Sequence, residues 1–359
     1  MTLAVTTLAR LAPMHVPPAD LSDAELRTAL IAGWRIEPSS IAYAPVGFGS
    51  HHWTVVESAS RRWFVTADAV ADSSTRLADL SAALRTALTL RRDAGLEFVR
   101  APVQHVNGGL LQMSGRYAIA VYPYLDVVAE TTEDHAADRV VDLIIALHAA
   151  TPAVEQIAAV DDFALPGRWS VQHLLDASHV DPPTGPYAAS FHDLIADHRR
   201  ILSEALLEYD RMASLMTADH TGWVITHGEP KINNILITSN GPVVIDWDTV
   251  RLAPPTRDLW MTDGHERYAE LTGRQVPSEQ LGFYRLRWDL TDLCSYGSWF
   301  CRPHEATPDI QLGWQGAAAI CARLSVGTPG PPWAKQSESP APCVAAPRGV
   351  TSTAIRLMR

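Results

Sequence analysis

The sequence predicts an α+β protein with two unequal lobes, a small antiparallel sheet with one helix followed by a larger, mainly helical part. Alternating apolar and polar residues, punctuated by turns, dominate the chain up to residue 121. After Asp126 the apolar residues recur at helical spacing instead. The length of 359 residues and a content of 47% hydrophobic and 19% charged residues suit a globular chain of this size.

The smaller lobe is built from turn-bounded strands. A helix opens at Ser22, which stands in capping-box spacing with Glu25, and Gly33 is expected to end it. The segments IAYAPV, WTVVES and RRWFVTA follow as strands, the first two joined by the glycine-rich turn GFGSHH. Residues 74–94 carry a leucine stripe typical of a helix. VRAPVQHV, GGLLQM and YAIAVYPYL supply the remaining strands.

The larger lobe is predicted from apolar periodicity. Helical spacing covers residues 134–150, 188–216, 277–300 and 316–324. The short apolar runs GWVIT, NILI and VVIDWDTV indicate strands between them. Pro, Gly, Ser and Ala then dominate, which predicts a disordered tail. The predicted units are residues 1–121, a hinge at 122–127, the second lobe at 128–324 and the tail at 325–359.

A polar run interrupts the apolar pattern of the second lobe. The segment THGEPKINNILI places Glu229 and Asn234 in a loop, because Gly228 and Pro230 do not suit a strand. A hairpin then brings Asp246 to the same end of a small sheet. Two carboxylates and an amide are hard oxygen ligands that suit Mg²⁺ and substrate phosphates. A carboxylate that binds no metal can orient a hydroxyl nucleophile, so the pattern favours phosphoryl transfer.

The motif H-G-E-x-x-x-x-N followed by I-D-W-D resembles the catalytic loop and metal-binding Asp of the aminoglycoside phosphotransferase and choline kinase group. VGFGSHH, VYPYLD, LHAAT and PPTRDLW stand where that group has its nucleotide-covering loop, its hinge, a helix end and a structural Asp segment. There is no G-x-x-x-x-G-K-[ST] motif, so this is not a P-loop protein. The resemblance implies a bilobal protein-kinase-like fold.

The resemblance also implies roles for individual positions. Glu229 falls where the family has its catalytic Asp, while Asn234 and Asp246 match its Mg²⁺ ligands. ATP or GTP is the implied co-substrate. His227 would fasten the loop by hydrogen bonds, and Asp248 and Asp258 would be structural. The implied nucleotide-binding residues are Gly47, Gly49, Ser50, His52, Thr66, Tyr122, Tyr124 and Leu125.

Two positions depart from the family pattern. Glu229 adds a methylene, which moves the carboxylate by roughly 1.5 Å; either Pro230 fixes the loop so that Glu reaches the acceptor, or the site is inactive. Thr66 stands where relatives carry a phosphate-binding Lys, and its hydroxyl brings no charge. Asp79 is the nearest acid on the following helix, either a pairing residue or an exposed charge. The basic residues available instead are Arg61, Arg62, Arg76, His51 and His52.

Several residues are candidates for contacting the acceptor. Lys231 either stabilises the moving phosphoryl group or is a solvated loop residue. Asp289, Asp292 and Trp299 of the helix predicted at 277–300 either bind a polyhydroxylated or cationic ligand or are surface charges over an aromatic core. Asp263 and Glu266 have the same two interpretations. His148, at the end of an apolar helix, is interpreted as a packing residue. The complete set of acceptor candidates is Lys231, Asp263, Glu266, Asp289, Asp292 and Trp299.

Composition narrows the partners and the compartment. The balance of 29 basic and 40 acidic residues gives a net charge of −11, which argues against a nucleic-acid partner. No apolar run approaches the roughly 18 residues that cross a bilayer. The four cysteines lack C-x-x-C spacing and no leader with a cleavage site is evident, which predicts a reducing, cytoplasmic compartment.

The predicted function is transfer of the γ-phosphate of ATP or GTP to a hydroxyl of an antibiotic-like small molecule. Aminoglycosides, aminocyclitols and sugar-bearing nucleoside antibiotics all fit, and the consequence would be resistance or self-resistance. One alternative is a kinase of a small metabolite such as a sugar, choline or an amino-alcohol. The departures at Thr66 and Glu229 leave open a nucleotide-binding pseudokinase.

Overall fold

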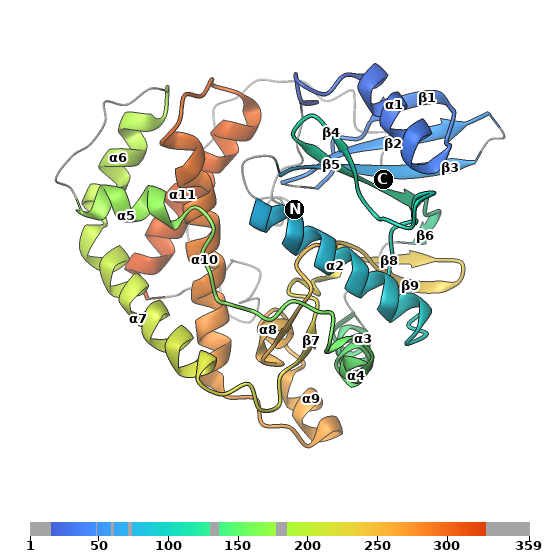
Figure 1. Ribbon diagram of the computed structural model, residues 1–359. Helices are drawn as coiled ribbons and strands as arrows, with labels where there is room; N and C mark the ends of the chain where they lie inside the picture. Colours follow the sequence, from blue (N-terminus) through green and yellow to red (C-terminus); the bar gives the residue numbers. More distant parts are fainter. Residues whose placement is uncertain are drawn as a thin grey trace, which may run out of the picture.

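A computed structural model of the chain describes residues 16–47, 49–58, 61–70, 74–129, 136–176 and 185–327. Figure 1 shows a sheet-rich part and a larger helical part, which confirms the predicted α+β bilobal fold. Phe48 of the glycine-rich turn, Asp134 and the predicted tail from residue 328 onward lie outside the described residues. None of the helices in the described ranges is long and apolar enough to cross a membrane.

The N-lobe contains a five-stranded antiparallel sheet in the order β1-β2-β3-β5-β4 and two helices. The Ser22–Glu25 capping box forms as predicted, but Gly33 does not end its helix, because the chain leaves the helix through Arg35 in the left-handed conformation. The bounds are α1 Asp23–Trp34, β1 Pro38–Tyr43, β2 His51–Glu57, β3 Arg62–Ala69, α2 Ser74–Arg92, β4 Gln112–Ser114 and β5 Tyr117–Pro123.

The predicted strand VRAPVQHV is a loop in the structure. Only Val99 forms a bridge, to Val244, and the rest of the segment follows turns around Gly108. Pro102 has no amide hydrogen to give to a sheet, which explains why a ladder does not continue through it. The loop nevertheless bonds to both lobes, because Arg100 donates its amide to Val244 and Val103 donates its amide to Val121.

Helix α2 packs against both lobes. Leu80 and Leu84 pack with Ala118 and Ala120 of β5, whereas another stripe of α2 enters the main core of the C-lobe. That second stripe consists of Ala83, Ala87 and Leu90. Arg251 of the C-lobe also pairs with Asp79 of α2 at 2.9 Å. The ion pair of Asp79 therefore links α2 to the C-lobe.

The C-lobe is a helical layer around two small antiparallel sheets, β7 with β10 and β6-β8-β9. The predicted helix over 188–216 is two helices that break at His198. The last predicted helix starts earlier than expected, since Thr307 caps it. The bounds are β6 Val127–Ala129, α3 Ala136–Ala149, α4 Thr151–Val154, α5 Arg168–Asp176, α6 Ala188–Asp197, α7 Arg199–Thr217, β7 Val224–Thr226, β8 Ile235–Thr238, β9 Gly241–Val244, β10 Arg251–Ala253, α8 Thr256–Leu259, α9 His265–Thr272, α10 Ser278–Phe300 and α11 Pro308–Ser325.

Candidate active site

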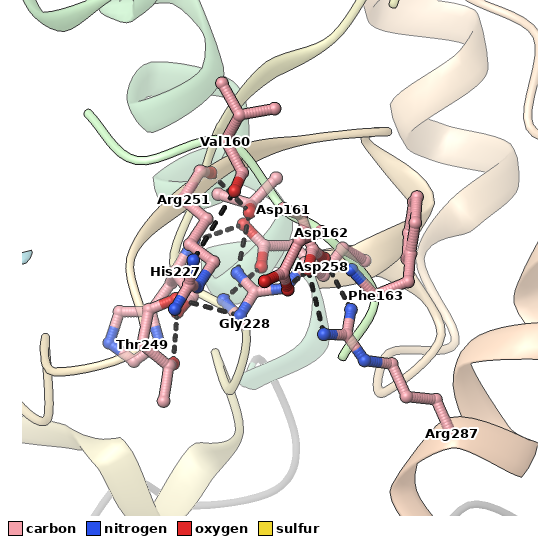
Figure 2. A network of polar contacts seen from close by, with 12 residues as sticks. Val160, Asp161, Asp162, Phe163, His227, Gly228, Thr249, Arg251, Asp258 and Arg287 are labelled. Carbon is pink, nitrogen blue, oxygen red and sulfur yellow. Dashed lines mark hydrogen bonds and ion pairs between the residues drawn. The ribbon is translucent and has the colours of Figure 1, made fainter. Parts of the chain in front are cut away.

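The catalytic loop, residues 227–234, follows β7 and is anchored from below by one buried acid. The Asp258 carboxylate accepts hydrogen bonds from the amides of His227 at 2.9 Å and Gly228 at 2.6 Å (Figure 2). It also lies 3.1 Å from His148 Nε2, and its side chain is fully buried. His148 is therefore more than a packing residue, because it completes the set of groups around the acid that holds the loop.

Gly228 is required by a close approach. Its φ is +98°, and a Cβ there would lie 2.5 Å from the Arg257 guanidinium. Arg257 in turn donates to Thr226 Oγ1 and to the carbonyl of Thr249, both at 2.8 Å. The glycine thus lets the loop pass over a buried cation that fastens the end of β7 to the turn before β10.

A second buried acid extends this support toward α10. Asp161 accepts two hydrogen bonds from the Arg287 guanidinium and lies 3.5 Å from Arg257 Nε (Figure 2). Burial would raise the pKa of Asp161, but the two cations outweigh it and bring the pKa down to about 2. The α10 helix is in this way tied to the base of the catalytic loop.

His227 fixes the shape of the loop, as predicted. Its Nδ1 accepts from the Glu229 amide at 3.1 Å, so its Nε2 carries the proton donated to the Ile245 carbonyl at 2.9 Å. Burial lowers its pKa and keeps the ring neutral. The ring therefore links Glu229 to the residue before Asp246, which accounts for bringing these two distant segments together.

Asn234 and Asp246 meet at the end of this link. Asn234 Nδ2 donates to the Glu229 carbonyl at 2.9 Å, and the Asn234 carbonyl accepts from the Ile245 amide at 2.9 Å. Asp246 has φ +70°, a conformation that costs energy for a non-glycine residue and is concentrated at functional sites.

Asp246 and Asp248 form a carboxyl pair exposed to solvent. Nearby protein removes part of their hydration, and the mutual repulsion adds to this, so the pKa of Asp246 is raised well above its usual range. The pKa of Asp248 rises to about 6 through desolvation and through the charges of Asp68 and Glu229. A bound cation would stabilise the charged form of both acids.

These groups fit Mg²⁺. No three His, Cys, Asp or Glu side chains cluster as a metal site within the described ranges. Among the described residues, only two carboxylates, those of Asp246 and Asp248, are therefore available beside the Asn234 amide oxygen. A Mg²⁺ ion held here would use these oxygens together with phosphate oxygens, a combination that this ion prefers. Asp248 was predicted to be structural, and its side-chain bond with Asp246 places it among the candidate ligands.

Glu229 lies beside a cation and a further acid. Lys231 Nζ is 2.7 Å from Glu229 Oε2 and 5.0 Å from the centre of the Trp288 ring. Asp292 is close enough that the charge of Glu229 acts on it; burial and then this charge raise the pKa of Asp292 to about 7. The loop and α10 thereby bring Glu229, Lys231, Trp288 and Asp292 into one neighbourhood, hereafter the acceptor group.

The other acceptor candidates lie elsewhere. Asp289 is fully buried and pairs with Arg323 of α11 at 2.5 Å. Trp299 packs against Tyr296 and α11, where a Cβ on Gly313 would approach its ring to 3.0 Å. Asp263 and Glu266 are exposed, and α9, which carries Glu266, lies at the lower end of the C-lobe in Figure 1, away from the N-lobe sheet. The structure does not bring these four residues into the acceptor group.

The predicted nucleotide loop joins β1 to β2. Gly47 and Gly49 both have positive φ, and a Cβ on Gly47 would approach His52 Nε2 to 3.0 Å. His52 stacks on Phe64, and burial lowers its pKa to about 4, so the ring is neutral. Ser50 Oγ donates to Asp68 at 2.5 Å, and this bond ties the loop to β3. Thr66 is paired with His52 across the sheet.

Part of the predicted hinge belongs to the N-lobe sheet. Tyr122 pairs with Phe64, and the Tyr124 amide donates to the Arg62 carbonyl at 3.1 Å. The Tyr124 ring lies under the Arg62 guanidinium at 4.3 Å, and Leu125 is half-buried. Tyr122 therefore belongs to β5 of the N-lobe sheet, and the Tyr124 amide is already engaged with β3.

The chain is similar in sequence and fold to known proteins. Residues 44–278 match the family model described as the phosphotransferase enzyme family. Protein StrN of Streptomyces griseus is 30% identical over 236 residues, which cover 63% of this chain and 72% of StrN. A spectinomycin phosphotransferase solved with ADP and spectinomycin has a TM-score of 0.62 at 15% identity, over 84% of this chain and 98% of that one. A microcompartment-associated aminopropanol kinase has a TM-score of 0.54 at 14% identity, over 84% and 97%.

The two solved structures share the fold of this chain, and the matched segment spans both the glycine-rich loop and the catalytic loop. The order of motifs along the chain therefore predicted its relationships correctly. The chain belongs to the phosphotransferase enzyme family.

Proposed function

We propose that this enzyme transfers the γ-phosphate of ATP or GTP to a hydroxyl of an antibiotic-like small molecule that also carries an amine. The observation that carries the proposal is the acceptor group, where Glu229 and Asp292 lie next to an aromatic ring and close to Asp246. Carboxylates and an aromatic face together suit a cationic, polyhydroxylated ligand.

Each residue has a task in this proposal. Glu229 accepts the proton of the acceptor hydroxyl, whose oxygen bonds to the γ-phosphorus as the bond to the β,γ-bridging oxygen breaks. Lys231 holds the Glu229 carboxylate in place and offsets negative charge on the moving phosphoryl group. Asp246, Asp248 and Asn234 would hold Mg²⁺, which supplies charge neutralisation of the phosphates when bound. The products are the phosphorylated acceptor and the nucleoside diphosphate.

The names of two proteins that share this fold support an acceptor that carries both a hydroxyl and an amine. One is named for spectinomycin, and another for aminopropanol, an alcohol that bears an amine. The longer Glu229 side chain is compatible with activity, because the Lys231 ammonium and the His227 ring fix the loop on which it stands. Both observations favour a working enzyme over a nucleotide-binding pseudokinase.

The test is phosphate transfer from labelled ATP and GTP by the purified chain. The acceptors are spectinomycin, an aminoglycoside, a sugar-bearing nucleoside antibiotic, choline and aminopropanol. Glu229→Gln is expected to lower turnover by roughly 10²-fold or more, because it removes the proton acceptor. Glu266→Gln, at an exposed position of α9, serves as the matched control and should leave turnover unchanged. Transfer to choline or aminopropanol alone would replace the antibiotic with a metabolite, and nucleotide binding without any transfer would sink the proposed activity.

A further inference from the structure

Helix α2 lies between the N-lobe sheet and the C-lobe (Figure 1). Just beyond its C-terminal end the chain is joined to β9 by backbone hydrogen bonds, from the Arg100 amide to the Val244 carbonyl at 3.0 Å and from the Val244 amide to the Phe98 carbonyl at 2.7 Å. Leu90, in the last turn of α2, lies in the C-lobe core. Uncharged groups therefore fix the C-terminal end of α2 to the C-lobe.

The first half of α2 packs on the N-lobe sheet. Leu80 and Leu84 are buried against Ala118 and Ala120 of β5. Strand β5 pairs with β3, and β3 pairs with β2, which begins at His51 where the glycine-rich loop ends. Because packed elements transmit displacements, a shift in the first half of α2 would reach that loop through the sheet.

Asp79 ties this half of α2 to the other lobe. Its Oδ2 lies 2.9 Å from Arg251 Nη2, and the exposed fractions of the two side chains are 42% and 21%. In protein kinases the acid of the corresponding helix pairs instead with a lysine of the strand equivalent to β3. Here that strand carries Thr66 at the position matched by the family resemblance, and the acid of α2 reaches across to the C-lobe.

Arg251 stands where the segments of the candidate site meet. It is the first residue of β10, which follows the turn that carries Asp246 and Asp248. Its carbonyl accepts from Thr226 Oγ1 at 2.8 Å, and Thr226 immediately precedes the catalytic loop. Its guanidinium also donates to the Val160 carbonyl at 3.4 Å. Arg251 thereby connects α2 both to the turn of the candidate metal ligands and to the strand that leads into the catalytic loop.

We propose that Asp79 and Arg251 are positioning residues, whose ion pair sets the distance between the glycine-rich loop and the turn that carries Asp246. A nucleoside triphosphate needs both segments, because the loop covers its phosphates and the turn would hold their metal ion. A nucleoside without phosphates needs neither. When the pair is broken, arrangements with the loop farther from the turn become more populated. The apparent affinity for the triphosphate then falls with the fraction of binding-competent molecules.

This inference rests on the proposed function only in taking a nucleotide as the phosphate donor. The experiment measures the dissociation constants of ATP with Mg²⁺ and of adenosine by calorimetry, so no acceptor is needed. The variants are Asp79→Asn, Arg251→Gln, the two combined, and Arg251→Lys. The matched control is the partly exposed pair of Asp142 in α3 with Arg267 in α9, 2.7 Å apart and within the C-lobe, broken by Asp142→Asn or Arg267→Gln.

We expect Asp79→Asn and Arg251→Gln each to weaken ATP binding roughly three- to tenfold, the effect of one partly buried ion pair on the competent population. Because both changes remove the same interaction, the combined variant should bind ATP no more weakly than the weaker single variant. Arg251→Lys should recover part of the affinity. Adenosine binding should stay unchanged throughout, and the Asp142 and Arg267 variants should bind both ligands like the wild type. A merely structural pair would not weaken ATP binding selectively.

Three results would overturn the assignment. The first is ATP binding by Asp79→Asn and Arg251→Gln that cannot be distinguished from that of Asp142→Asn. The second is equal weakening of ATP and adenosine, which would indicate general damage to the fold. The third is a combined variant in which the two losses multiply, since the residues would then act separately. Any of these would leave the proposed transfer reaction intact, whereas absence of transfer to every acceptor would leave the binding comparison valid, so the two failures are distinguishable.

Discussion

Replacing Asp258 with Asn tests whether one buried carboxylate holds the catalytic loop. The carboxylate accepts from His227 N, Gly228 N and His148 Nε2. An amide can keep the two bonds on one oxygen, but its NH₂ then faces the Gly228 amide, donor against donor. A lost hydrogen bond to a charged group costs about 1.5–3 kcal/mol, and the two that remain are weakened because the acceptor is now neutral. We therefore expect unfolding to become easier by about 2–4 kcal/mol.

The assay is denaturant unfolding followed by tryptophan fluorescence. Trp247 reports on the loop because its ring lies 4.6 Å from that of His227. Asp263→Asn is the control; Asp263 is exposed, and surface changes of this kind usually stay within about 0.5 kcal/mol. An Asp258→Asn protein as stable as the control at pH 7 would refute the reasoning.

The Asp258→Asn variant also tests how the stability of the protein depends on pH. Burial alone would raise the pKa of Asp258, but the hydrogen bond and charge of His148, followed by Arg257 and His227, lower it below the usual 3.8. A lowered carboxyl pKa contributes stability that is fully present above the unfolded value and is lost as pH falls through the folded value. The stability gap between wild type and Asp258→Asn should therefore narrow below about pH 4. A gap that stays constant into acid would contradict the assigned charge.

Three further outcomes are expected. Gly228→Ala should lose about 2 kcal/mol or more of stability, measured by denaturant unfolding, because its Cβ would meet the Arg257 guanidinium at 2.5 Å and its φ is +98°; a neutral effect would show that the loop relaxes freely. For a cationic acceptor, kcat/KM should rise with pH through about 7 as Asp292 ionises, and this step should vanish in Asp292→Asn; a pH profile identical in both proteins would remove Asp292 from acceptor binding. Lys231→Met should lower kcat by roughly 10- to 100-fold with nucleotide affinity unchanged, checked by steady-state kinetics and calorimetry, whereas unaltered turnover would make Lys231 a bystander.

The sequence was most informative where local chemistry decides the conformation. Gly228 and Pro230 exclude a strand, so the catalytic loop and its polar residues were predictable from the chain alone. The capping box at Ser22 was predictable as well, because it depends only on two residues three positions apart. Residues 188–216 were harder, because apolar spacing continues across His198 and gives no sign that the helix breaks there.

Partners that are distant in sequence decided the rest. Asp289 and Asp292 are three residues apart on one helix, yet only Asp289 meets Arg323 of α11. Spacing along α10 contains no information about that arginine, so the two acids had equal standing as acceptor candidates. Asp68 was missed for a related reason: its position matters only once the sheet register and the Ser50 bond are known.

The double packing of α2 has a consequence for dissecting the molecule. Ala83, Ala87 and Leu90 lie in the C-lobe core, while Leu80 and Leu84 cover the N-lobe sheet. A fragment that stops after β5 would expose Ala83, Ala87 and Leu90 to water, and the complementary fragment would lack part of its own interior. Neither piece is a self-sufficient folding unit, so reassembly of this protein from two separately produced halves would require both to be present while folding takes place.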